Sequence, residues 1–174
     1  MKSRQKVVEG VIFSVSESLL AEGVIGVLAR YFGKFPHLKC GCYFFYNSEP
    51  FGKRTYELLK SLTPIKVCQT SDLGFKTGEW SIIENIDCWE TERTKWKLPA
   101  FKSVDAANPL LATVRTYDDI TNSIYSEANV TAIEALGYHQ DGVEGHKYTE
   151  SQLNYIIEYK KEEQFRKMGQ NPIH

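Results

Sequence analysis

Residues 22–46 read EGVIGVLARYFGKFPHLKCGCYFFY. Two apolar runs within this stretch, 22–32 and 38–46, are rich in β-branched and aromatic residues, and a short segment containing Gly33 and Pro36 joins them. Two such runs with a short Gly-containing connection are typical of a β-hairpin. Because both runs are apolar on both faces, we expect the hairpin in the middle of a sheet that is covered on each side.

Arg30 is the one charged residue between Val24 and Phe32. A cation within an apolar strand either extends its charged end to the edge of the sheet or is paired with an anion. The sequence leaves both alternatives open.

The chain on either side of the hairpin alternates between apolar runs and turn residues. In a helix over 55–62, Tyr56, Leu59 and Leu62 would share the face that packs on the sheet. Gly74–Gly78 has the composition of a loop, and residues 87–97 have no clear period, which indicates a surface loop or an irregular hairpin. Strands are predicted over residues 7–15, 64–73, 79–86, 110–117 and 123–127.

The last third of the chain has helical signals. Asn129 could cap a short helix that ends at Leu136, before Gly137. Thr149 and Gln152 have the spacing of a capping box, which predicts a longer helix over 149–165. Leu153, Ile156 and Ile157 would form its apolar stripe.

These elements predict a single α+β domain over residues 1–174. We expect a strongly bent, mainly antiparallel and barrel-like sheet with three short-to-medium helices, near 55–62, 130–136 and 149–165, of which the C-terminal helix is the longest. The residues expected in its core are Val24, Leu28, Phe44, Trp80 and Val114.

Composition excludes several classes of function. The 174 residues are 42% hydrophobic and 25% charged, as in an ordinary globular protein, and the net charge of −1 argues against binding to nucleic acid. No apolar run is long enough for a membrane span, and no signal-peptide pattern follows the basic residues at the N-terminus. We therefore expect a cytoplasmic protein, if the chain is bacterial, with no membrane partner.

The four cysteines predict no disulfide in that compartment. Cys40 and Cys42 share one face of a strand but are not spaced as a C-x-x-C pair, and Cys68 and Cys88 are isolated. We expect all four to be buried as small hydrophobic residues. The alternative is a metal site formed by Cys40, Cys42 and His37.

No catalytic motif is complete. The four histidines do not form an H-E-x-x-H pattern, and the chain lacks a G-x-S-x-G elbow, a P-loop and a G-x-G-x-x-G motif. His139 and His146 lie near Asp141 and Glu144, so a metal site there is an alternative to a polar surface loop. We expect no catalytic set, no metal and no cofactor, which favours a binding protein over an enzyme.

The segment from Asp87 to Lys97 combines aromatic and acidic residues. Tryptophan is enriched among the residues that dominate interface energies, and acidic residues suit a basic partner. We predict a partner-binding surface here, with Trp89 and Trp96 as anchors and a charged rim of Asp87, Glu90 and Glu92. The alternatives are core packing of the tryptophans and a solvated acidic rim.

The order of several short motifs resembles the immunity protein 26 family, which is associated with bacterial polymorphic toxin systems. The chain departs from the family's pattern at Val11, Asn47 and Ser81. The matching motifs are Glu9-Gly10-Val11-Ile12-Phe13, Gly26-Val27-Leu28-Ala29-Arg30, Gly41-Cys42-Tyr43-Phe44-Phe45, Leu73-Gly74 with Gly78-Glu79-Trp80, and Leu98-Pro99-Ala100-Phe101.

The resemblance implies a small cytoplasmic protein that binds a cognate toxin and neutralises it. The family is also linked to phosphotriesterases, so the alternative is a metal-dependent hydrolase of that type. A third alternative is a structural subunit of a larger assembly. The sequence leaves the toxin and the oligomeric state open.

Overall fold

The computed structural model describes residues 6–32, 39–47 and 56–169, with side chains through residue 164. Its elements, in chain order, are β1 (Val11–Ser14), α1 (Glu17–Ala21), β2 (Val24–Phe32), β3 (Lys39–Tyr46), α2 (Tyr56–Ser61), β4 (Lys66–Ser71), α3 (Leu73–Thr77), β5 (Ser81–Asn85), α4 (Trp89–Glu92), the 3₁₀-helix η1 (Arg93–Lys95), β6 (Phe101–Val104), β7 (Leu111–Tyr117), β8 (Ile124–Thr131), the 3₁₀-helix η2 (Glu134–Gly137), β9 (His139–Gln140), β10 (Val143–Glu144) and α5 (His146–Gly169).

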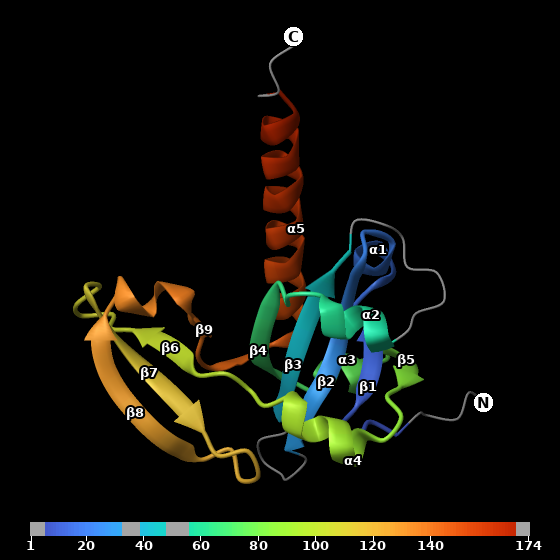
Figure 1. The fold of residues 1–174 in the computed structure, drawn as a ribbon, viewed down its shortest axis with the longest axis horizontal. Helices are drawn as coiled ribbons and strands as arrows, with labels where there is room; N and C mark the ends of the chain where they lie inside the picture. Colours follow the sequence, from blue (N-terminus) through green and yellow to red (C-terminus); the bar gives the residue numbers. More distant parts are fainter. Residues whose placement is uncertain (1–5, 33–38, 48–55, 170–174) are drawn as a thin grey trace.

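The strands form two open sheets (Figure 1). Sheet A has the order β10-β4-β3-β2-β1-β5, and sheet B has the order β8-β7-β6-β9. The pairs β10–β4 and β6–β9 are parallel, and the others are antiparallel. The predicted α+β class, the mainly antiparallel pairing and the longest helix at the C-terminal end are confirmed. The expectation of one barrel-like sheet is corrected, because the strands divide between two sheets and neither sheet closes.

The hairpin of residues 22–46 is the centre of sheet A, as the sequence predicts. β2 and β3 pair antiparallel from Val24 opposite Tyr46 to Phe32 opposite Lys39, with an irregularity between Leu28 and Arg30. β1 and β4 pair with the outer edges of this hairpin. The connection over 33–38 lies outside the described residues.

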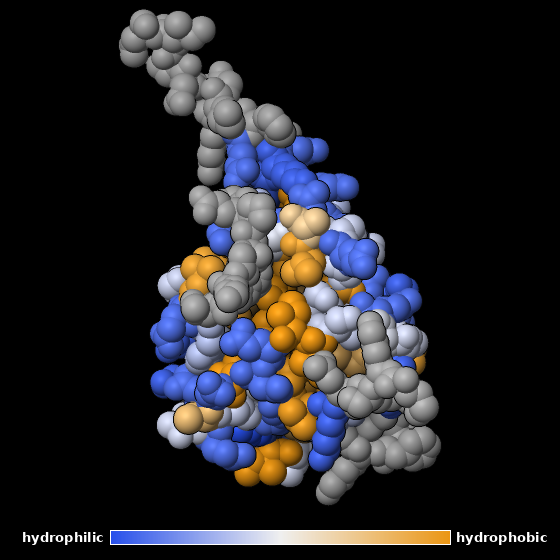
Figure 2. All heavy atoms as spheres, turned by 90° about the vertical axis from the view of Figure 1, so that its right-hand side faces the viewer, coloured by the Kyte–Doolittle hydropathy of each residue, from blue (hydrophilic) through white to orange (hydrophobic). Residues whose placement is uncertain are grey.

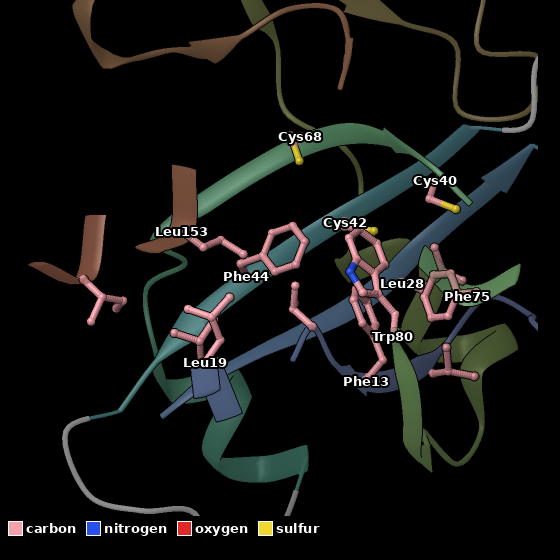
Figure 3. Packing of buried hydrophobic residues seen from close by; sticks show 14 residues of the cluster. Phe13, Leu19, Leu28, Cys40, Cys42, Phe44, Cys68, Phe75, Trp80 and Leu153 are labelled. Carbon is pink, nitrogen blue, oxygen red and sulfur yellow. The ribbon is translucent and has the colours of Figure 1, made fainter. Parts of the chain in front are cut away.

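Both faces of sheet A are covered, because successive side chains of a strand point to opposite faces. Val24 and Leu28 of β2 face the first core, where helices α1, α3 and α5 contribute apolar side chains (Figure 3). Ile25, Val27 and Ala29 face the second core. The second core is completed by Ile12, Phe45, Leu59, Ile86 and Trp96, with Tyr43, Tyr56, Leu62 and Trp89 packed against it.

Two segments predicted as loops are short helices. Leu73–Thr77 forms α3 and ends at Gly78, which has a left-handed backbone with φ of 80°. Trp89–Glu92 and Arg93–Lys95 form α4 and η1. A single helical turn has too few residues to show a hydrophobic period, so no local pattern in the sequence identifies it.

The helix predicted over 130–136 is wrong in its first part. β8 continues to Thr131, because Ala128 and Val130 pair with Val114 and Ala112 of β7, and only a 3₁₀ turn follows. The predicted capping box is also wrong, because α5 begins at His146. Thr149 lies within the helix, where its hydroxyl donates to Glu144 Oε2 at 3.0 Å.

Most of the predicted core is confirmed. Val24, Leu28, Phe44 and Trp80 are buried. Val114 is half-buried, because it lies on β7 of sheet B and the two hydrophobic cores lie on sheet A. All four cysteines are free thiols. Cys40, Cys42 and Cys68 are buried in the first core, but Cys88 is exposed, because it precedes α4 at the surface with φ of 56°.

Candidate partner-binding groove beside α2

The segment predicted to bind a partner lies over the second core of sheet A. Trp96 is 7% exposed, and its ring meets those of Tyr43 and Phe45 nearly at right angles, with centroids 5.2 Å and 5.8 Å away. Its indole N–H donates to the hydroxyl of Tyr56, at the start of α2. Trp96 therefore joins the predicted segment to β3 and α2.

An apolar pocket of about 290 Å³ opens between these elements. Trp96 forms part of its wall, and the rest comes mainly from β3, α2 and the segment after α2. The lining residues are Tyr43, Phe45, Tyr56, Leu59, Lys60, Leu62, Pro64, Lys95 and Trp96. Tyr43 and Tyr56 are half-buried, so their rings are partly open to a partner, whereas Trp96 and Phe45 are buried in the wall.

An acidic pocket of about 220 Å³ lies beside it. Both pockets are lined by Tyr56 and Lys60, so they adjoin at these two residues, and we call the two pockets together the α2 groove. At the acidic end, four carboxylates face one ammonium group. The lining residues there are Tyr56, Glu57, Lys60, Glu84, Ile86, Asp87 and Glu92.

Figure 2 shows the side of the molecule on which β5 lies. Hydrophobic surface runs down the middle of this face, and hydrophilic surface flanks it. An apolar strip between hydrophilic borders resembles the apolar centre and polar rim of protein-binding surfaces.

Three ionisable groups of the groove, Tyr56, Glu92 and Lys60, have shifted pKa values. Burial raises the pKa of Tyr56 to about 12, opposed by the hydrogen bond from Trp96 and reinforced by the bond to Glu92, whose Oε2 accepts at 2.8 Å. Hydrogen bonds from Lys95 and Tyr56 lower the pKa of Glu92, and the hydrogen bond to Glu57 raises the pKa of Lys60. All three shifts are away from neutrality, which suits charge recognition rather than proton transfer.

The structure separates the five predicted binding residues into two sets. Trp96, Asp87 and Glu92 line the α2 groove. Glu90 is exposed on α4 and lines neither part of the groove. Trp89 is half-buried away from the groove and packs over Gly10, where an added Cβ would lie 2.6 Å from the indole Cγ.

Sequence reasoning missed the residues that β3 and α2 contribute. Tyr43 and Phe45 are two apart on one strand and therefore share a face, and Tyr56 and Lys60 are four apart on one helix. These spacings identify two faces, but no local signal shows that the faces meet beside Trp96. That meeting depends on the packing of α2 next to η1.

The residues considered for a metal site are not assembled for one. The backbone N–H of Val67 donates to Nδ1 of His139, whose pKa is lowered by burial, and Nε2 of His146 lies 2.7 Å from Glu79. Burial raises the pKa of the Cys40 and Cys42 thiols, and His37 lies outside the described residues. No three His, Cys, Asp or Glu side chains in the described ranges are grouped to hold a metal ion. The donor set that a metal-dependent hydrolase needs is therefore not brought together among them.

Comparisons with known proteins gave no match to a family model, to a curated protein or to a solved structure. Among the helices in the described ranges, none combines the length and the apolar character that crossing a membrane requires.

Proposed function

We propose that this chain is a cytoplasmic immunity protein, which binds a basic bacterial toxin in the α2 groove and neutralises it. The observation that carries the proposal is the groove itself, in which an aromatic end adjoins an acidic end. The order of the short motifs supports a toxin as the kind of partner.

Each end of the groove has a separate role. Buried aromatic anchors supply most of the binding energy of an interface, so an apolar or aromatic side chain of the toxin would occupy the end beside Trp96. Acidic rim residues attract a basic partner and raise its association rate. Glu84 and Asp87 form no ion pair with any described residue, so they are available to a cation of the toxin.

The test is a co-expression survival assay with the toxin encoded beside the gene. The double variant Glu84→Lys, Asp87→Lys reverses the charge at the acidic end. We expect it to lose protection and to raise the Kd for the toxin about 10- to 100-fold at low salt, chiefly through slower association. High salt should reduce the difference, because it screens exposed charges.

The matched control is Glu90→Lys, which reverses an exposed acid on α4 that lines neither part of the groove. It should protect as well as the wild type, and circular dichroism should show that all variants are folded. Full protection by the double variant would show that the groove is not the binding site. A wild-type chain that neither binds the toxin nor protects against it would refute the proposed function.

A further inference from the structure

β8 is an open edge of sheet B. Among the described strands it pairs with β7 alone, and in Figure 1 it is the outermost strand of sheet B. All its side chains except that of Val130 are exposed, on both faces of the strand. A strand edge with unpaired backbone groups is a template for pairing with another strand.

β8 lacks the charges that usually protect an edge. Proteins block exposed edges with lysine, proline or a bulge, and the sequence of β8, IYSEANVT, contains neither lysine nor proline. Its one charge, Glu127, accepts a hydrogen bond from Arg115 of its own chain at 2.6 Å. The irregularity in its pairing lies at the end near Ile124, so Ser126 to Thr131 is regular.

The backbone groups that face outward can be identified from the pairing. The N–H of Ala132 donates to the carbonyl of Leu110 on the β7 side. Since hydrogen-bonding direction alternates along an antiparallel strand, the even-numbered residues of this part of β8 bond to β7, and Glu127, Asn129 and Thr131 direct their backbone groups outward. The N–H of Thr131 already donates to Glu134 Oε2 at 2.8 Å. The open part of the edge is therefore centred near Ala128.

Both ends of the edge carry exposed apolar side chains. Ile124 and Tyr125 are 54% and 79% exposed at one end, and Ile133 and Leu136 are 79% and 73% exposed beyond the other. When two copies of one strand pair antiparallel, the beginning of each lies beside the end of the other. Self-pairing therefore places the Ile124 end of each strand beside the Ile133 end of the other copy, so the apolar ends meet at two places related by the twofold axis.

We propose that the protein forms a homodimer in which β8 pairs antiparallel with β8 of a second copy, about a twofold axis at Ala128. This register places Glu127 opposite Asn129 and makes the outward backbone groups of both residues hydrogen-bond partners. A register centred on Glu127 would set two carboxylates directly opposite each other, which is unfavourable. The dimer joins two copies of sheet B and uses no residue of the α2 groove.

The experiment measures the molar mass of the full chain by sedimentation equilibrium over a wide concentration range. The wild type should have twice the mass of the chain. Ala128→Arg places two arginines against each other at the axis and should raise the dimer Kd at least about 100-fold. Ala107→Arg adds the same charge at an exposed alanine outside the edge and should remain dimeric.

Two variants with opposite charges at residue 128 test the register, and they also distinguish a lost dimer contact from misfolding. Ala128→Arg and Ala128→Glu should each be monomeric alone, and an equimolar mixture should form the heterodimer, because residue 128 meets its own copy at the axis. A monomeric wild type, or an Ala128→Arg variant that remains dimeric, would overturn the proposal. Monomeric variants that do not associate when mixed would overturn the register. None of these outcomes depends on whether a toxin binds.

Discussion

Arg30 is a fully buried cation at the centre of sheet A. Of the two alternatives left by the sequence, the structure shows the paired one. Its Nε donates to Asp119 Oδ1 at 2.6 Å, and its other nitrogens donate to the carbonyls of Ala29 and Arg93. A buried charge without such partners would be strongly unfavourable.

Asp119 is shared between two arginines. Arg93 Nη1 donates to its Oδ2 at 2.8 Å, and Arg93 Nε donates to Glu9 Oε2 at 2.8 Å. Burial alone would raise the pKa of Asp119, but the hydrogen bond and charge of Arg30, with those of Arg93, lower it overall. The contribution of Asp119 to this network therefore depends on its ionisation.

Asp119→Asn should lower the free energy of unfolding by about 2 kcal/mol at pH 7. The loss of a whole partner of a buried charge costs about 3–5 kcal/mol, and here Arg93 remains and the Asp119 side chain is 31% exposed. Because the folded pKa lies below the unfolded value of about 3.9, the contribution is complete above that pH and is lost as the pH falls below it. Urea unfolding of both proteins from pH 7 to pH 2.5 should show the difference shrinking in acid.

Asp87→Asn is the control, because Asp87 forms no ion pair with a described residue. Its stability should match the wild type throughout this pH range. A constant difference between Asp119→Asn and the wild type from pH 7 to pH 2.5 would show that ionisation of Asp119 does not stabilise the fold.

Among the elements, α5 shows how one helix face is fixed by packing. Leu153 and Ile157 are buried in the first core, whereas Tyr148, Tyr155 and Tyr159 are exposed. Only one side of the helix contacts sheet A, and the helix projects beyond the sheet (Figure 1). The apolar stripe predicted for this helix therefore identifies the side that packs.

Leu153→Ala should lower the free energy of unfolding by about 2–5 kcal/mol, since it removes a fully buried side chain and leaves a cavity. Tyr155→Ala, on the exposed side of the same helix, should change it by no more than about 0.5 kcal/mol. Denaturant unfolding followed by circular dichroism measures both. Equal losses for the two variants would contradict the assigned face of α5.

At the scale of the molecule, the two sheets differ in what they bury. Sheet A has a core on each face, whereas the strands of sheet B bury Phe101 and Ala112. Polar contacts join the β7–β8 turn to sheet A, including the Arg30–Asp119 pair and two hydrogen bonds between the amides of Gln69 and Asn122. The single domain over residues 1–174 stays a prediction.

We expect one cooperative unfolding transition, because sheet B has too little buried apolar surface to be stable alone. The three tryptophans pack in the cores of sheet A, so their fluorescence reports on that sheet, while far-UV circular dichroism reports on both. The two melting curves should coincide. Native-state hydrogen exchange that finds the amides of β7 opening well below the global free energy would show that sheet B unfolds separately.

The sequence by itself determined the parts of the protein that depend on local pattern. The central hairpin, its burial on both faces and the core positions Leu28, Phe44 and Trp80 follow from apolar periodicity. The inward side of α2 follows from the same periodicity, and so does that of α5. For the candidate site, the sequence identified Asp87, Glu92 and Trp96, because acidic and aromatic residues are close together in one segment.

Only the tertiary structure decided which distant segments meet. Arg30 and Asp119 are 89 residues apart, and Tyr56 meets Trp96 across 40 residues. The helix predicted after Asn129 begins as a strand instead, because β7 pairs with residues 128–131. Such pairings depend on the free energy of the whole packed chain, which no local window of sequence contains.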